Sequence, residues 1–155
     1  PGQGTTVTIY LPISGRRTPT ATKRAVPRQS GNTVLVVEDE EPIRRVAQRV
    51  LERHGFTVLT ASDGIEALAL YRDNESDVAL ILTDVIMPRM GGKVLYQTLR
   101  SAGKLVPIMF MSGYAARGET LEVAQIDPAM DILPKPWNVE QLVARVREAI
   151  GMAES

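Results

Sequence analysis

The sequence predicts an α/β fold, a doubly wound parallel sheet of the (βα)5 kind with helices on both faces. Short apolar runs alternate with amphipathic segments along most of the chain, and this order is typical of parallel strands joined by right-handed crossovers. The run from Val78 to Leu82 is continuously apolar, as in a strand buried on both faces. Several runs end on charged or hydroxyl residues, and in open α/β sheets ligands bind beyond the carboxyl ends of the strands.

The first half of the sheet region begins with a strand at residues 33–37. A helix follows Pro42, whose missing N–H is harmless in a first turn, and Gly55 takes the left-handed position that ends it. Residues 56–61 form the next strand, and Gly64 begins the next helix. The residues expected to face the sheet from these two helices share helical spacing: Ile43, Val46, Ala47, Val50, Leu51, Ile65, Leu68 and Ala69.

The second half is organised around the stretch 78–88, an apolar run that rises to Asp84 and breaks at Pro88. The later elements are a helix from Gly92 to Gly103, a strand at 106–111, a weaker helix at about 115–125, a strand at 131–133 and a last helix at about 138–150. The apolar and small residues expected to face the sheet from the third and last helices are Val94, Leu95, Thr98, Leu99, Val139, Leu142, Val143, Val146 and Ile150.

The first 31 residues have a different texture. Residues 7–11 read as one strand, which needs a sheet that the neighbouring sequence does not supply. Residues 13–31 are rich in Ser, Thr, Gly, Pro, Arg and Lys and predict a solvated linker. Its positive charges lack the interleaved aromatic residues of a nucleic-acid site. The predicted domain therefore spans residues 32–152.

Composition excludes several classes of protein. Acidic and basic residues number 18 each, so the net charge is zero and favours neither nucleic acid nor a charged membrane as a partner. There is no cysteine, which excludes disulfides and thiolate metal sites and fits a cytoplasmic location. No apolar run approaches the roughly 20 residues of a membrane-spanning helix.

Five side chains should meet where the parallel strands end: Glu38, Asp39, Asp84, Ser112 and Lys135. Asp84 alone could simply cap a turn. Several carboxylates at one edge repel each other, so either one of them stays protonated or a divalent cation compensates the charge. Oxygen ligands favour Mg²⁺ or Mn²⁺. Such a set suits phosphoryl transfer to Asp84, with Lys135 neutralising phosphoryl oxygens and an acyl phosphate as the product.

On these residues the chain strongly resembles the receiver domain of two-component response regulators, over about residues 33–150. Four short motifs carry the resemblance, each at a strand end: Val37-Glu38-Asp39-Glu40, Thr83-Asp84-Val85-Ile86-Met87-Pro88, Met111-Ser112-Gly113-Tyr114 and Leu133-Pro134-Lys135-Pro136-Trp137. The resemblance implies a flavodoxin-like sheet with strand order 2-1-3-4-5. It also implies a cis peptide bond between Lys135 and Pro136.

The resemblance assigns a role to each site residue. Asp84 is the expected phosphoacceptor, Lys135 and Ser112 assist it, and the expected Mg²⁺ ligands are Glu38, Asp39, Asp84 and the backbone carbonyl of Ile86. The expected donor is a histidine kinase or a histidine phosphotransfer protein, and the expected consequence is a change in the surface of the fourth and fifth helices. A weak homodimer is a further expectation. Whether to class the domain as an enzyme stays open, because it would catalyse only its own phosphorylation and dephosphorylation.

Two positions depart from the family pattern. Glu38 stands where Asp is common, and its longer side chain is expected to reach a metal only through water. Ile132 stands where many receivers have a tyrosine or phenylalanine that rotates on phosphorylation. Coupling of Ser112 to the fourth helix would then be weaker or would use another residue, such as Tyr114.

The first twelve residues resemble the end of a histidine kinase ATP-binding domain, through Gly2-Gln3-Gly4-Thr5-Thr6 and the strand after it. This resemblance implies a receiver from a hybrid sensor kinase, with the kinase core outside these 155 residues. Two rival functions exist for a site of this kind. A phosphatase with an aspartate nucleophile needs a second acid two positions after that aspartate, but position 86 holds Ile86. A receiver-like interaction module that is not phosphorylated, and regulates its kinase, remains the alternative.

Overall fold

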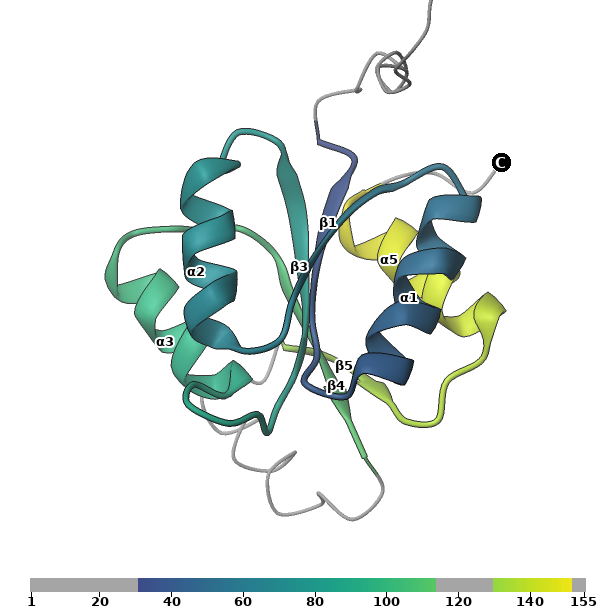
Figure 1. Ribbon diagram of the computed structural model, residues 1–155. Helices are drawn as coiled ribbons and strands as arrows, with labels where there is room; N and C mark the ends of the chain where they lie inside the picture. Colours follow the sequence, from purple (N-terminus) through teal and green to yellow (C-terminus); the bar gives the residue numbers. More distant parts are fainter. Residues whose placement is uncertain (1–30, 114–129, 152–155) are drawn as a thin grey trace, which may run out of the picture.

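A computed structural model describes residues 31–113 and 130–151 of the chain, and these residues form a three-layered α/β domain (Figure 1). One five-stranded sheet occupies the middle layer, and two of the described helices cover each of its faces. The predicted strand at residues 7–11, the linker up to residue 30, the helix at about 115–125 and Tyr114 lie outside the described residues.

All strand pairs are parallel and the spatial order is β2-β1-β3-β4-β5, so the predicted sheet and strand order are confirmed. The three inner strands, β1, β3 and β4, are strongly apolar and lie between two helix layers, so their residues alternate between two cores rather than between core and water. The strands are β1 (Thr33–Val37), β2 (Thr57–Ala61), β3 (Val78–Asp84), β4 (Ile108–Ser112) and β5 (Asp131–Pro134).

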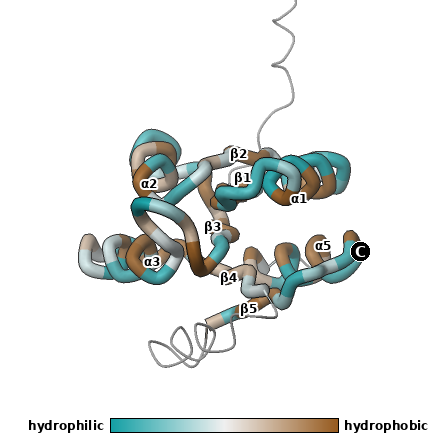
Figure 2. Tube along the Cα trace, turned by 60° about the horizontal axis from the view of Figure 1, so that its bottom comes forward, coloured by the Kyte–Doolittle hydropathy of each residue, from teal (hydrophilic) through white to brown (hydrophobic). Residues whose placement is uncertain are grey.

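The described helices form two pairs. On one face of the sheet lie α1 (Glu41–Arg53) and α5 (Val139–Ala149), and on the other lie α2 (Gly64–Asp73) and α3 (Gly92–Ser101). Leu35 and Val37 of β1 face α2 and α3, whereas Val34 and Val36 face α1 and α5. Figure 2 shows the hydrophobic strand segments in the space between the two helix pairs.

The fourth strand begins later than the sequence predicts. It starts at Ile108 rather than Val106, and it includes Ser112 as its last residue. Pro107 has no N–H to donate to a neighbouring strand, although its carbonyl accepts a hydrogen bond from the N–H of Ile81 at 2.9 Å. Val106 is nevertheless buried. The apolar run therefore predicts too early a start for the strand, although it correctly marks Val106 as a core residue.

The prediction that six of the helix residues face the sheet is wrong. Val46, Ile65, Val94 and Val139 are 51%, 51%, 48% and 45% exposed, and Ala69 and Thr98 are exposed as well. Each helix reaches the sheet mainly through one row of residues spaced four apart, and the other apolar residues of the stripe flank that row. The buried rows are Ala47 and Leu51, Ala67 and Tyr71, Leu95 and Leu99, and Leu142 and Val146.

Within the described part of the chain, no helix combines the length and the apolar composition needed to cross a bilayer.

Candidate phosphoacceptor site

The register of the sheet brings the predicted site residues to one edge. Val37 of β1 lies opposite Thr83 of β3, so Glu38 and Asp84 follow as neighbours. On the other side of β3, Asp84 lies opposite Met111, and the next residue of β4, Ser112, lies opposite Pro134 of β5. Because all strands run parallel, one rim collects residues that are up to 97 positions apart in sequence.

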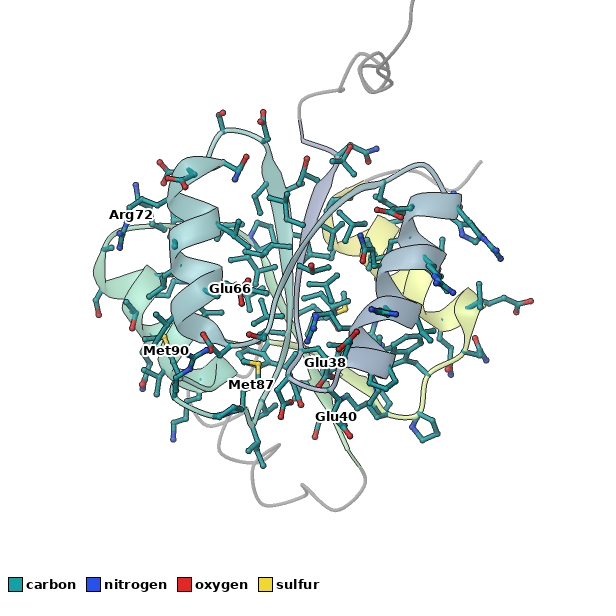
Figure 3. The ribbon with its side chains drawn as sticks, in the orientation of Figure 1. Glu38, Glu40, Glu66, Arg72, Met87 and Met90 are labelled. Carbon is teal, nitrogen blue, oxygen red and sulfur yellow. The ribbon has the colours of Figure 1, made fainter. Side chains whose placement is uncertain are left out.

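Lys135 is the centre of this rim. Its Nζ lies 2.6 Å from Oε2 of Glu38 and 3.3 Å from Oδ2 of Asp84. The Lys135 and Asp84 side chains are each 14% exposed, whereas that of Glu38 is fully buried, at the end of β1 in Figure 3. The second carboxylate oxygen of Glu38, Oε1, accepts the Glu40 backbone N–H at 3.2 Å. Both Glu38 oxygens therefore have a hydrogen-bond donor.

The loop that places Lys135 is fixed by its backbone. The Lys135 N–H donates to the carbonyl of Ser112 at 2.7 Å. The peptide bond between Lys135 and Pro136 is cis, as predicted. Trp137 packs against the core cluster that includes Leu142 and Val146 of α5.

Burial and charge shift two ionisation equilibria at the site. Burial raises the pKa of Glu38 to about 7, and the negative charge of Asp84 adds to this, although the hydrogen bond from Lys135 opposes it. For Lys135, burial disfavours the charged form, but the hydrogen bond to Glu38 and the charge of Asp84 together raise its pKa above the ordinary value. Lys135 therefore stays positively charged at neutral pH, and it lies beside Glu38, a carboxyl group whose pKa is about 7.

Asp84 is held by its own backbone surroundings. Its Oδ1 accepts the N–H of Val85 at 2.8 Å, while its Oδ2 faces Lys135. Thr83 donates its hydroxyl to the Asp84 carbonyl at 2.9 Å. The carboxylate is thus oriented on both oxygens yet remains partly open to solvent, which a nucleophile for an external substrate requires.

Glu38, Asp39 and Asp84 form an acidic cluster in which one carboxylate oxygen of each lies within 4.8 Å of the others. Asp39 is exposed and Asp84 is half-buried, so the cluster is accessible from one side. An all-oxygen donor set of this kind fits Mg²⁺, which keeps several waters and uses only one or two carboxylates. The residues present therefore fit the divalent cation that receiver domains bind.

Ser112 and Ile86 are the remaining predicted site residues, at the end of β4 and in the loop after β3. Ser112 is buried and its hydroxyl donates to the Gly113 carbonyl at 3.4 Å. Ile86 lies two residues beyond Asp84, and its side chain is 55% exposed. Ile132, at the aromatic position, is half-buried in β5, and its carbonyl accepts from Arg145 Nη2 at 3.2 Å.

One contributor was missed by sequence reasoning. Arg44 of α1 donates from Nη1 to the Glu38 carbonyl at 2.6 Å, which ties the first turn of α1 to the end of β1. Arg44 is one of several arginines interspersed among the apolar residues of α1, as in many amphipathic helices. No spacing rule separates it from its neighbours, so only the fold could reveal its contact.

An apolar groove of about 470 Å³ borders the site. It runs between the first half of α1 and the turn after β5, and its lining residues are Pro42, Ile43, Val46, Gly113, Lys135, Pro136 and Trp137. Lys135 therefore contacts two members of the acidic cluster and also lines this groove.

The strand order, together with the meeting of acids and a lysine at the carboxyl edge, is that of a receiver domain in two-component signal transduction. The chain belongs to this family, because the model of the response regulator receiver domain matches residues 34–147. The chain is 35% identical to the sensor kinase CckA of Brucella abortus (strain 2308) over 159 residues, which cover 96% of this chain and 17% of that protein. It is 41% identical to the response regulator MprA of Mycobacterium ulcerans (strain Agy99) over 74% of this chain and 48% of MprA.

Solved structures agree. The receiver domain of the hybrid histidine kinase CckA matches with a TM-score of 0.62 and 33% identity, covering 76% of this chain and 98% of that one. A receiver domain protein from Clostridium thermocellum matches with a TM-score of 0.69 and 25% identity over 77% of this chain and 94% of that one. The chain thus spans nearly all of a solved receiver domain, but only about half of MprA and about a sixth of CckA.

Proposed function

We propose that Asp84 is the phosphoacceptor of this receiver domain, and that it takes its phosphoryl group from a phosphohistidine with the help of Lys135, Ser112 and Mg²⁺. The observation that carries this proposal is the position of Asp84, the last residue of β3, with Oδ2 3.3 Å from Lys135 Nζ and a side chain 14% exposed. No other described acid combines a strand-end position, a lysine partner and access to solvent.

The chemistry follows from these groups. An Asp84 carboxylate oxygen attacks phosphorus in line, the P–N bond of the phosphohistidine breaks, and its electron pair remains on the imidazole nitrogen. Lys135 lies close enough to neutralise charge that develops on the phosphoryl oxygens. The Ser112 hydroxyl is proposed to contact the phosphoryl group once that group is bound to Asp84.

Asp39, Asp84 and the backbone carbonyl of Ile86 are the proposed Mg²⁺ ligands. Glu38 is proposed to act through water, since both of its oxygens already accept hydrogen bonds. When bound, Mg²⁺ neutralises negative charge on the acids and on the phosphoryl oxygens.

The experiment compares the two aspartates at opposite ends of β3, one just before the strand and one as its last residue. Asp77 immediately precedes β3 and Asp84 ends it, so Asp77→Asn is a matched control for Asp84→Asn. With a small phosphodonor and Mg²⁺, intact-mass analysis should find one added phosphoryl group on the wild-type protein and on Asp77→Asn, and none on Asp84→Asn. The same addition to Asp84→Asn would refute the assignment.

We further propose that the protein that donates the phosphoryl group, a histidine kinase or a histidine phosphotransfer protein, docks on the apolar groove beside the site. The groove shares Lys135 with the acidic cluster, so a helix resting in it would bring its histidine toward Asp84. Val46 in the groove is 51% exposed, and Val94 on α3, outside it, is 48% exposed.

These two valines offer a test. Val46→Asp should slow transfer from a phosphohistidine protein by about 10-fold, because a buried charge in an interface core costs more than 1 kcal/mol. Transfer from a small phosphodonor should stay unchanged, and Val94→Asp should leave both reactions unchanged. Equal transfer rates for Val46→Asp and Val94→Asp would place the docking surface elsewhere.

Residues 1–12 are proposed to be the end of a histidine kinase ATP-binding domain, and residues 13–31 a linker to the receiver at 32–152. The match to the sensor kinase CckA supports this, since a match to 96% of the chain must extend into the first 30 residues. A hybrid kinase would place the receiver in the cytoplasm, where ATP is available. A coding sequence upstream of Pro1 without a kinase core would contradict it, and sedimentation at rising concentration tests the expected weak homodimer.

A further inference from the structure

The loop from Val85 to Gly91, which joins β3 to α3, controls the surroundings of Asp84 at both of its ends. At its beginning, the N–H of Val85 donates to Asp84 Oδ1 at 2.8 Å. At its end, the Gly92 N–H donates to the Val85 carbonyl at 2.9 Å, and a methyl group added to Gly92 would lie 2.3 Å from the Asp84 carbonyl oxygen. The direction of the Val85 N–H, and with it the Asp84 carboxylate, therefore depends on the course of this loop.

The tip of the loop is fastened to the beginning of α2. Arg89 forms an ion pair from Nη2 to Oδ2 of Asp63, the residue that caps α2, and the Asp63 side chain is fully buried. The other oxygen of Asp63 accepts the N–H of Glu66 at 2.9 Å. The Gly64 N–H donates to the Met90 carbonyl at 2.9 Å, and Figure 3 shows Met87 and Met90 on this loop.

The backbone of Arg89 indicates that the ion pair holds the loop in a conformation that it would not otherwise prefer. Arg89 has φ of 65°, in the described chain the one residue other than glycine with a positive φ. That region costs an ordinary residue about 1 kcal/mol or more, and glycine would occupy it more easily. Glycine, however, would leave the buried carboxylate of Asp63 without its cation. The Arg89 side chain is 65% exposed, but leaving the buried carboxylate of Asp63 uncompensated is strongly destabilising, so the pair can hold the loop against the backbone preference.

We propose that Arg89 and Asp63 are positioning residues, whose ion pair fixes the loop after β3 and thereby orients Asp84 for phosphoryl acceptance and Mg²⁺ binding. This inference rests on the proposed function of Asp84. Neither residue touches the reacting atoms. They act through the loop, in the way that groups behind a metal site orient its ligands, and loss of such groups typically costs about 10-fold to 100-fold in affinity or activity.

The test uses Arg89→Gln, Asp63→Asn, their double variant and Arg89→Lys. Asp63→Asn keeps an oxygen that can cap α2 and removes only the charge. The matched control is Lys104→Gln, which breaks the 2.5 Å ion pair between Lys104 and Glu75 beyond the opposite ends of α3 and α2. Each protein is titrated calorimetrically with Mg²⁺, and its rate of phosphorylation by a small phosphodonor is measured over a range of Mg²⁺ concentrations.

Each single variant should bind Mg²⁺ about 10-fold more weakly and be phosphorylated about 10-fold more slowly at subsaturating Mg²⁺. The double variant should resemble either single variant, since both remove one interaction. Arg89→Lys should restore part of the loss, and Lys104→Gln should match the wild-type protein. If a single variant does not fold, the neutral double variant carries the comparison, because it leaves no unpaired buried charge.

Wild-type Mg²⁺ affinity and phosphorylation rate in folded variants would overturn the inference, even with a lower urea midpoint, since that would leave the pair only a structural role. Independent losses that add in the double variant would also overturn it. A wild-type protein that takes no phosphoryl group contradicts the proposed function itself, and is thereby distinguished from a failure confined to Arg89 and Asp63.

Discussion

Replacing Glu38 by glutamine should change how the stability of the domain depends on pH. Glu38 is fully buried at the end of β1, and burial together with the charge of Asp84 raises its pKa from the ordinary 4.5 to about 7. Glutamine has nearly the same shape and still accepts the Glu40 N–H, but it cannot ionise. The substitution therefore isolates the proton equilibrium of a single side chain.

The sign and size follow from linkage between proton binding and folding. A carboxyl group with a raised pKa in the folded state binds its proton more tightly there than in the unfolded chain. Its contribution to stability is then complete below pH 4.5 and is lost as the pH rises through about 7. At about 1.4 kcal/mol for each pH unit, the difference corresponds to a loss of about 3 kcal/mol.

The assay is urea unfolding without Mg²⁺ at several values between pH 4 and pH 8, followed by the fluorescence of Trp137, the single tryptophan. Subtracting the Glu38→Gln curve from the wild-type curve removes the other titrating groups, because they are common to both proteins. The difference should favour the wild-type protein by up to about 3 kcal/mol more at pH 4.5 than at pH 7.5. Glu41→Gln, on the exposed face of α1, serves as the surface control and should parallel the wild-type curve.

Parallel curves for the wild-type protein and Glu38→Gln would refute the reasoning, because Glu38 would then ionise alike in the folded and unfolded chains. Saturating Mg²⁺ gives a second check. A cation favours the ionised acids, so Mg²⁺ should bind more tightly as the pH rises through about 7 and should reduce the wild-type loss of stability. An affinity for Mg²⁺ that is constant over this range would contradict a protonated Glu38.

Two further substitutions test the packing and the charge balance of the site. Gly92→Ala places a methyl group 2.3 Å from the Asp84 carbonyl oxygen, so α3 or β3 must shift. We expect a loss of about 1–3 kcal/mol in urea unfolding and slower phosphorylation, and an unchanged urea midpoint would contradict the close contact. Lys135→Ala removes the cation that lies 2.6 Å from Glu38, and it should destabilise the protein by about 3 kcal/mol at pH 8 without Mg²⁺. The loss should be smaller at pH 5, where Glu38 holds its proton, and equal losses at the two pH values would show that the charge is irrelevant.

Most of the site could be predicted from the sequence because it depends on strand ends. The apolar runs before Glu38, Asp84 and Lys135 mark buried parallel strands, and in such a sheet the residues that follow the strands meet at one edge. The structure brings Glu38, Asp39, Asp84 and Lys135 together. The sequence leaves two ways to relieve the repulsion between these acids, a protonated carboxylate or a bound cation. The raised pKa of Glu38 corresponds to the first of them.

Other features depend on information that local patterns do not contain. The apolar stripe of a helix does not reveal which of its rows reaches the sheet, so Val46 and Ile65 were expected to be buried although both are 51% exposed. The positive φ of Arg89 has no sequence signal, because the residue is neither glycine nor asparagine. Its partner Asp63 is 26 positions away, and only the packing of α2 against the loop brings the two together.

The departure at Ile132 bears on how phosphorylation would reach the surface. Ile132 is half-buried in β5, and Arg145 of α5 both donates to its carbonyl and forms an ion pair with Asp131. An isoleucine cannot offer the hydroxyl or the flat ring of a tyrosine. A signal that passes through β5 would therefore move backbone and packing contacts rather than an aromatic side chain.

The most direct measurement locates the phosphoryl group on the chain itself. Borohydride reduces an acyl phosphate of aspartate to homoserine, so peptide mass spectrometry after phosphorylation with Mg²⁺ and borohydride treatment identifies the modified residue. Homoserine at Asp84, and at no other aspartate, is the predicted result. Homoserine at Asp39 or Asp63 instead, or none at any position, would contradict the assignment of Asp84 as the phosphoacceptor.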